Sequence, residues 1–178
     1  MSYIGKTPTS VPLTSSDITN GIITTAKIAD DAISAAKLAA GVGGKVLQVS
    51  NFVQTSSAQN LSSASYTDLT AITIAITPTA SDSKILISAR INARTQDQRG
   101  FGMQFVRGAT SIYATLATYS IYTNGVTEMY SAYPFSYIDS PNTTSETTYK
   151  IQVRTHSGSE VNFNAGINSN IYLMEIGA

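Results

Sequence analysis

Hydrophobic and polar residues alternate along much of the chain after residue 45. Residues 71–77 place isoleucine at every second position, and residues 84–93 do the same with isoleucine and alanine. Side chains two positions apart lie on the same face of a β-strand, so both segments are typical of strands with one buried face. We therefore predict a strand in each segment.

Similar patterns continue to the C-terminus, separated by short segments rich in glycine, proline, asparagine and serine. The further strands are expected at residues 45–54, 101–107, 110–116, 126–138, 147–155, 160–165 and 170–176. Short strands with turn residues between them are typical of a β-sandwich. We predict a mainly β fold in which residues 45–178 form a jelly-roll-like β-sandwich knob.

The chain before residue 45 has a different pattern, an approximate ten-residue repeat in which residues 18–27 align with residues 28–37. Large apolar residues recur every five positions, which distributes them around all sides of a helix and on alternate faces of a strand. One such chain cannot bury them alone, so the repeat favours packing against other copies of itself. The candidate stalk residues are Ile18, Ile23, Ile28, Ile33 and Leu38.

These patterns divide the chain into three parts. We expect an extended arm at residues 1–16, an intertwined stalk with a glycine linker at residues 17–44, and the knob at residues 45–178. A disordered tail whose repeat is accidental is the alternative interpretation of the N-terminal region.

Charge is low and balanced, with 11 basic and 11 acidic residues, and charged residues make up 12% of the chain. This balance argues against binding to nucleic acid, which depends on clustered positive charge. A modest cluster formed by Arg90, Arg94, Arg99 and Arg107 is expected to lie at solvated strand edges. The chain has no cysteine and one histidine, so we expect no metal and no cofactor. We see no signal peptide and no segment long and apolar enough for membrane insertion.

Several stretches resemble known proteins. The opening Met-Ser-Tyr-Ile-Gly-x-x-Pro-Thr-Ser-Val-Pro-Leu-Thr, and the Ala-Lys-Ile-Ala-Asp type repeats after it, resemble the N-terminal part of tail-fibre and other virion structural proteins of marine and cyanobacterial bacteriophages. The distal part resembles a domain of the same proteins. Its matching stretches are residues 83–87, 105–108, 137–141, 147–154 and 172–176. Many of these relatives carry long shafts, whereas this chain has one repeat array and one distal domain.

The resemblance implies a homotrimeric virion protein whose N-terminal arm docks on another tail or capsid component. The candidate docking residues are Tyr3, Ile4, Pro8, Val11, Pro12 and Leu13.

Tyrosine is concentrated in the distal domain. The chain has 10 tyrosines, and a cluster of them falls between residues 113 and 137. A phenol ring offers flat apolar area with a hydroxyl at its edge, which suits contact with glycans and with proteins. The candidate receptor contacts are Tyr113, Tyr119, Tyr122, Tyr130 and Tyr133. The alternative is that these rings pave sheet faces or an interface between subunits.

No pattern of catalytic residues is present. The distal carboxylates have no motif that pairs them, as glycoside hydrolysis requires. We therefore expect no enzyme. The resemblance implies a bacteriophage virion structural protein. Its expected role is that of a short trimeric tail fibre, which attaches the particle to a polysaccharide or protein of the host surface. A capsid or tail decoration or cement protein without a receptor role is the alternative, and a glycan-degrading enzyme is a third hypothesis.

Overall fold

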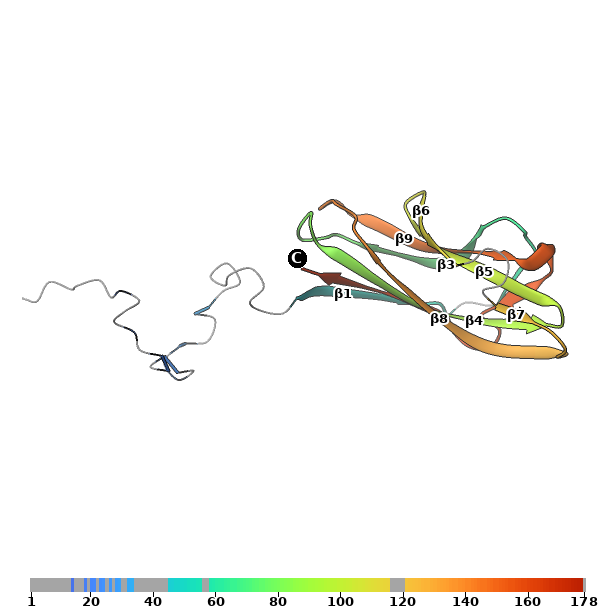
Figure 1. The fold of residues 1–178 in the computed structure, drawn as a ribbon, viewed down its shortest axis with the longest axis horizontal. Coiled ribbons are helices and arrows are strands. Elements are labelled where there is room, and N and C mark those ends of the chain that lie inside the picture. The colour runs from blue at the N-terminus through green and yellow to red at the C-terminus, as the bar shows by residue number, and fades with distance from the viewer. Residues whose placement is uncertain are drawn as a thin grey trace, which may run out of the picture. The chain divides into compact units, whose positions relative to one another are not determined.

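A computed structural model shows that residues after Gly43 form a β-sandwich (Figure 1). The described residues are 14, 18, 20–21, 23–24, 26, 28–29, 32–33, 45–55, 58–115 and 121–177. The chain divides into two units, Met1–Gly43 and Gly44–Ala178. The second unit contains β1 (Val46–Val53), β2 (Gln59–Leu61), β3 (Thr67–Ile76), β4 (Lys84–Gln96), β5 (Arg99–Arg107), β6 (Thr110–Ala114), β7 (Ile121–Thr123), β8 (Glu128–Asp139), β9 (Thr147–Thr155), the short 3₁₀ helix η4 (His156–Gly158), β10 (Val161–Phe163) and β11 (Asn170–Ile176).

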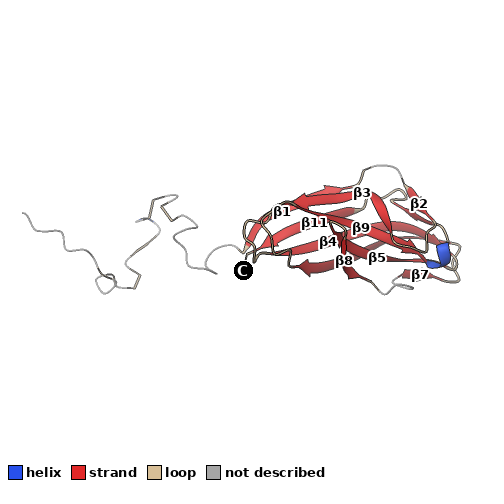
Figure 2. Cartoon of the chain, turned by 90° about the horizontal axis from the view of Figure 1, so that it is seen from above, coloured by secondary structure: helices blue, strands red, loops and turns tan. Residues whose placement is uncertain are grey.

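The strands form two antiparallel sheets, which overlap in the view of Figure 2. In the first sheet the long strand β4 pairs with β8 along one edge, and its other edge is shared by β11 and β10. Strand β1 continues this sheet beyond β11, and β2 continues it beyond β10. In the second sheet the order is β3, β9 and β5, and both β6 and β7 pair with the free edge of β5.

The strand order is that of a jelly roll. Eight main strands remain when β6 and β7 are counted as one strand and the short strands β2 and β10 are left out. In the first sheet these strands lie in the order β1, β11, β4 and β8, which are the first, eighth, third and sixth along the chain. In the second sheet the order is β3, β9, β5 and then β6 with β7, which are the second, seventh, fourth and fifth. This is the path of an eight-stranded double sheet built from two Greek keys. The predicted mainly β fold and β-sandwich are confirmed.

The core lies between the sheets and follows the predicted alternation. On β4, the inward residues Ile85, Ile87 and Ile91 are fully buried, whereas Lys84, Ser88 and Arg90 point outward. Strand β5 is buried along almost its whole length, because β9 and two other strands flank it. Apolar area removed from water in this way is the main favourable term in folding.

Aromatic pairs bridge the two sheets beside the edge strand β8. Phe101 and Tyr133 lie 5.2 Å apart between ring centroids, and Phe105 stacks on Phe135 at 4.1 Å. The third pair is Tyr113 with Tyr137 at 4.9 Å. The three β8 residues are alternate residues of its inner face, so this part of the tyrosine-rich segment closes one side of the core.

Some details differ from the predicted elements. The short strands β2 and β7 lack an alternating pattern of their own and were not predicted. Arg107, expected at a solvated edge, instead donates hydrogen bonds to the buried carboxylate of Asp139. That contact is possible because β5 ends beside the turn that follows β8.

Few residues of the N-terminal unit are described. Among them, Ile18, Ile23, Ile28 and Ile33 are exposed, by between 38% and 53%. The amide of Ala32 donates to the carbonyl of Ala29, which forms a turn. The docking candidates Tyr3, Ile4, Pro8, Val11, Pro12 and Leu13 and the stalk candidate Leu38 lie outside the described residues.

Glu175 on β11 is a buried carboxylate that joins three parts of the knob. It accepts hydrogen bonds from the side-chain amide of Gln48 on β1 at 2.6 Å and from the amide and hydroxyl of Thr79 at 2.7 and 2.8 Å. Burial opposes ionisation, but the hydrogen bonds from Gln48 and Thr79 outweigh it and lower the pKa of Glu175 to about 2. The ionised carboxylate therefore stabilises the folded state.

Glu175→Gln should reduce the dependence of stability on pH. The pKa in the folded state lies below the ordinary value of 4.5, so the stabilisation is present above about pH 4.5 and is lost as the pH falls toward 2. Urea unfolding of the wild-type chain should show this loss, and the variant should be less stable at pH 7 by about 1 to 3 kcal/mol with a flatter curve. Parallel curves for the two proteins would show that Glu175 does not carry this pH dependence.

Candidate binding surface

The predicted receptor tyrosines do not form one patch. Tyr113 and Tyr133 take part in the aromatic pairs between the sheets, and Tyr122 on β7 lies against His156, with 5.2 Å between ring centroids. Tyr130 points outward from β8 and is 54% exposed. Tyr119 lies outside the described residues. Among the described candidates, Tyr130 presents the most exposed ring.

Tyr130 belongs to a polar row that crosses four strands on the outer face of the first sheet. Asn60 on β2 pairs with Asn162 on β10, Asn162 pairs with Arg94 on β4, and Arg94 pairs with Tyr130 on β8. Paired residues on adjacent strands point to the same face of a sheet. We call these four residues the polar row.

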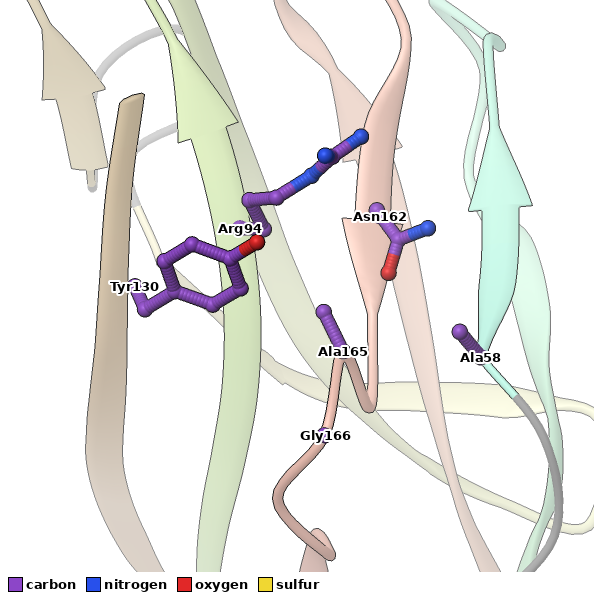
Figure 3. A pocket seen from close by; sticks show the side chains of 6 residues that line it. All are labelled: Ala58, Arg94, Tyr130, Asn162, Ala165 and Gly166. Carbon is purple, nitrogen blue, oxygen red and sulfur yellow. The ribbon is translucent and has the colours of Figure 1, made fainter.

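A shallow pocket opens at the polar row (Figure 3). Its volume is about 330 Å³, and it is lined by Ala58, Arg94, Tyr130, Asn162, Ala165 and Gly166. The ring of Tyr130 and the side chain of Arg94 lie together on one side, and Asn162 lies across from them (Figure 3). The hollow exists because three of the lining residues are alanine or glycine, next to longer side chains.

The positive charge in the pocket is balanced by a neighbouring carboxylate. The guanidinium of Arg94 lies 2.8 Å from Glu128, and both side chains are partly exposed. A hydrogen bond with Tyr130, together with the charge of Glu128, raises the pKa of Arg94 above its ordinary value. The pocket therefore presents a protonated donor and an exposed ring, and the carboxylate beside it brings the local net charge close to zero.

One hydrogen-bond acceptor among the asparagine side chains of the polar row has no partner within the described part of the knob. Asn162 donates a hydrogen bond from its side-chain nitrogen to the side-chain oxygen of Asn60. The side-chain oxygen of Asn162 is buried and has no hydrogen-bond partner among the described residues. Buried polar atoms without a partner are uncommon in folded proteins. The wall of the pocket thus has an incomplete hydrogen-bond network.

An apolar row crosses the opposite end of the same face. Val49 on β1 pairs with Met174 on β11, Met174 pairs with Leu86 on β4, and Leu86 pairs with Ile138 on β8. The two outer members, Val49 and Ile138, are 56% and 55% exposed. We call these four residues the apolar row. It lies near Val46, where the chain enters β1 and where Val46 is itself exposed.

The two rows are well separated along β4. Leu86 of the apolar row and Arg94 of the polar row are eight positions apart on one strand. At the rise of a β-strand this is about 27 Å. One face of the sandwich therefore offers apolar surface near the entry of the chain and a polar pocket at the far end.

The outer face of the second sheet differs, because its polar side chains satisfy one another. Asp68 accepts hydrogen bonds from Gln152 at 2.7 Å and from Lys150 at 2.9 Å, and Gln104 donates to Gln152 at 2.5 Å. The hydrogen bonds from Gln152 and Lys150 lower the pKa of Asp68. These groups are occupied within the protein, which makes this face a weaker candidate for binding.

Carboxylates in the knob also have structural partners. Asp97 accepts a hydrogen bond from the amide of Gly125 at 2.6 Å, and Asp139 is paired with Arg107. Within the described part of the chain, no group of three or more histidine, cysteine, aspartate or glutamate residues is placed to hold a metal ion. The same part contains no helix with the length and apolar character of a membrane span.

The polar row is not predictable from the sequence as a unit, although two of its members, Arg94 and Tyr130, stand out there as part of an arginine cluster and of the tyrosine cluster. Asn60 and Asn162 lie on short strands that are far apart in the sequence. Their pairing depends on β2 adding to the edge of β10, which itself pairs with β4. The sequence carries no local signal for this contact.

Comparison with known proteins adds a distant structural likeness. No protein-family model matches the sequence, and no curated protein matches it. Among solved structures, the chain is similar to the VP2 subviral particle of infectious bursal disease virus, with a TM-score of 0.49 and 10% sequence identity. The match covers 74% of this chain and 34% of the VP2 chain, so the chain spans about a third of that protein. A likeness this distant carries no functional argument.

Proposed function

We propose that the chain is a bacteriophage attachment protein, a short homotrimeric tail fibre that contacts the host surface through its C-terminal β-sandwich. The virion assignment is supported by the resemblance of the N-terminal motif and the repeats to tail-fibre proteins. In this proposal residues 1–16 dock on another virion component, and residues 17–44 form the stalk.

The division of one sheet face into two rows is the observation that carries this proposal. Exposed apolar rows of this kind favour association with another protein surface. The apolar row lies where the chain enters the knob, so it is placed to contact the knobs of the other subunits. The polar row and its pocket lie about 27 Å away along β4, where they stay open to a receptor.

Association of three chains is further supported by the isoleucines of the repeat. Four isoleucines at five-residue spacing are exposed in the single chain. Packing against the same residues of two other chains would remove them from water. A trimer would also carry three copies of the shallow pocket. Several linked sites raise the overall affinity even where each single contact is weak.

Binding to host cells tests the proposed function. The full-length chain, purified and labelled with a fluorophore, should bind the host of its particle saturably and should slow adsorption of that particle. A bovine serum albumin control labelled in the same way should do neither. A chain that does not bind host cells, but coats the capsid or tail, would instead be a decoration protein.

A further inference from the structure

We infer that the pocket at the polar row binds a neutral sugar residue of a surface polysaccharide. This inference deepens the proposed function and rests on it, because it names the class of receptor and the place of contact. It follows from the shape of the pocket, from its charge, from the exposed ring of Tyr130 and from the side-chain oxygen of Asn162, which has no hydrogen-bond partner in the part of the chain that the structure describes.

Shape is the first reason. A volume of about 330 Å³ lies at the lower end of the usual range for small-ligand sites. The pocket is open, so a sugar within a longer chain can enter while its neighbours remain outside. Ala58, Ala165 and Gly166 form low walls on two sides, which leaves room for a ring to lie against Tyr130 (Figure 3).

The aromatic ring is the second reason. More than half of Tyr130 is exposed, and its hydroxyl interacts with Arg94. A sugar ring has faces made of C–H groups, which pack on the flat apolar face of a phenol.

The polar groups are the third reason. Arg94 offers further donors, Glu128 offers an acceptor, and Asn162 has a side-chain oxygen without a partner. Sugar hydroxyls both donate and accept, so they match a mixed set of this kind. With a small movement of the Asn162 side chain, a sugar hydroxyl would supply the missing hydrogen bond.

Charge decides between neutral and acidic sugars. Arg94 is the one cationic side chain among the residues that line this pocket, and Glu128 neutralises it at 2.8 Å. A carboxylate on the sugar would have to compete with Glu128 for the same guanidinium. The pocket therefore favours a neutral sugar over a uronic acid.

Saturation-transfer NMR on the full-length chain tests this inference. The probes are the methyl glycosides of glucose, galactose, mannose, rhamnose and N-acetylglucosamine, with methyl glucuronide as the charged comparison. At least one neutral glycoside should bind with a Kd of about 1 mM or lower, and more tightly than the glucuronide. Failure of all five neutral probes to bind, or tighter binding of the glucuronide, would overturn the inference.

Variants locate the binding site. Tyr130→Ala should weaken binding of the neutral glycoside about tenfold, because the stacking surface is lost, whereas Tyr130→Phe should change it by less than about threefold. Asn162→Ala should also weaken binding. Tyr172→Ala is the matched control, since Tyr172 is an exposed tyrosine on the same outer face but outside the pocket. Equal losses in Tyr130→Ala and Tyr172→Ala would refute the assigned site, and melting curves exclude unfolding as the cause.

The inference and the proposed function fail in different ways. Loss of sugar binding in Tyr130→Ala with unchanged adsorption of particles that carry this variant would support the pocket and contradict its receptor role. Host-cell binding by a chain that binds none of the neutral glycosides would support attachment and contradict the sugar site.

Discussion

Replacing Ile18, Ile23, Ile28 and Ile33 with serine is expected to convert the proposed trimer of the full-length chain into a monomer. Each isoleucine is exposed in the single chain, and burying such a side chain contributes about 1.5 to 3 kcal/mol. In the proposed trimer, four positions in each of three chains would therefore contribute substantially to the free energy of association. Sedimentation equilibrium should give three times the chain mass of 18.8 kDa for the wild type and a single chain mass for the variant.

A matched control changes polar positions of the same repeat. Asn20→Ala and Thr24→Ala alter described residues that lie between the isoleucines, and the doubly substituted chain should remain trimeric. The knob should stay folded in both proteins, because Gly44–Ala178 has a core of its own. A wild-type chain that sediments as a monomer at micromolar concentration would refute the trimer.

Asp139→Ala is expected to destabilise the knob, because it breaks a buried hydrogen-bond network. Asp139 is buried, and its carboxylate accepts hydrogen bonds from Arg107 at 2.9 and 3.0 Å and from the hydroxyl of Tyr149 at 2.7 Å. Burial and the hydrogen bond to Asp139 raise the pKa of Tyr149 far above its ordinary value, which keeps the phenol a neutral donor. Removing the carboxylate leaves the hydroxyl of Tyr149 without its acceptor, and leaves Arg107 with the carbonyl of Ser140 as its acceptor.

The expected decrease in unfolding free energy is about 3 kcal/mol. This lies at the lower end for a broken buried pair, because Arg107 keeps partial access to water. Urea unfolding measures the difference. Glu146→Ala, which removes an exposed carboxylate seven positions further along, should change stability by less than about 0.5 kcal/mol. Similar values for the two variants would show that the buried network contributes little.

The sandwich could be predicted from the sequence because its signal is local. The isoleucines of β4 and the alternating residues of β8 show at once which face is buried. Strand β5 is buried along almost its whole length and lacks a comparable alternation, so it was predicted from the turn residues that flank it. Register and strand order depend on contacts between distant segments, and local patterns do not specify them.

The candidate site was predicted only in part for the same reason. The concentration of tyrosine predicted receptor contacts within residues 113–133, but composition does not show which face of a strand a ring occupies. Tyr133 and Tyr130 lie three positions apart on β8 and point to opposite faces of the sheet. The asparagines of the polar row belong to strands of three residues each, and only the folded chain brings them beside Arg94.

Adsorption of particles that lack this chain is the most direct test of the attachment role. Particles made without the chain should adsorb to the host at least tenfold more slowly than wild-type particles, and supplying the wild-type chain during assembly should restore the rate. Supplying a chain without residues 1–16 should not restore it, because that arm is proposed to dock the fibre on the virion. Normal adsorption by particles without the chain would contradict the attachment role and leave a decoration protein in its place.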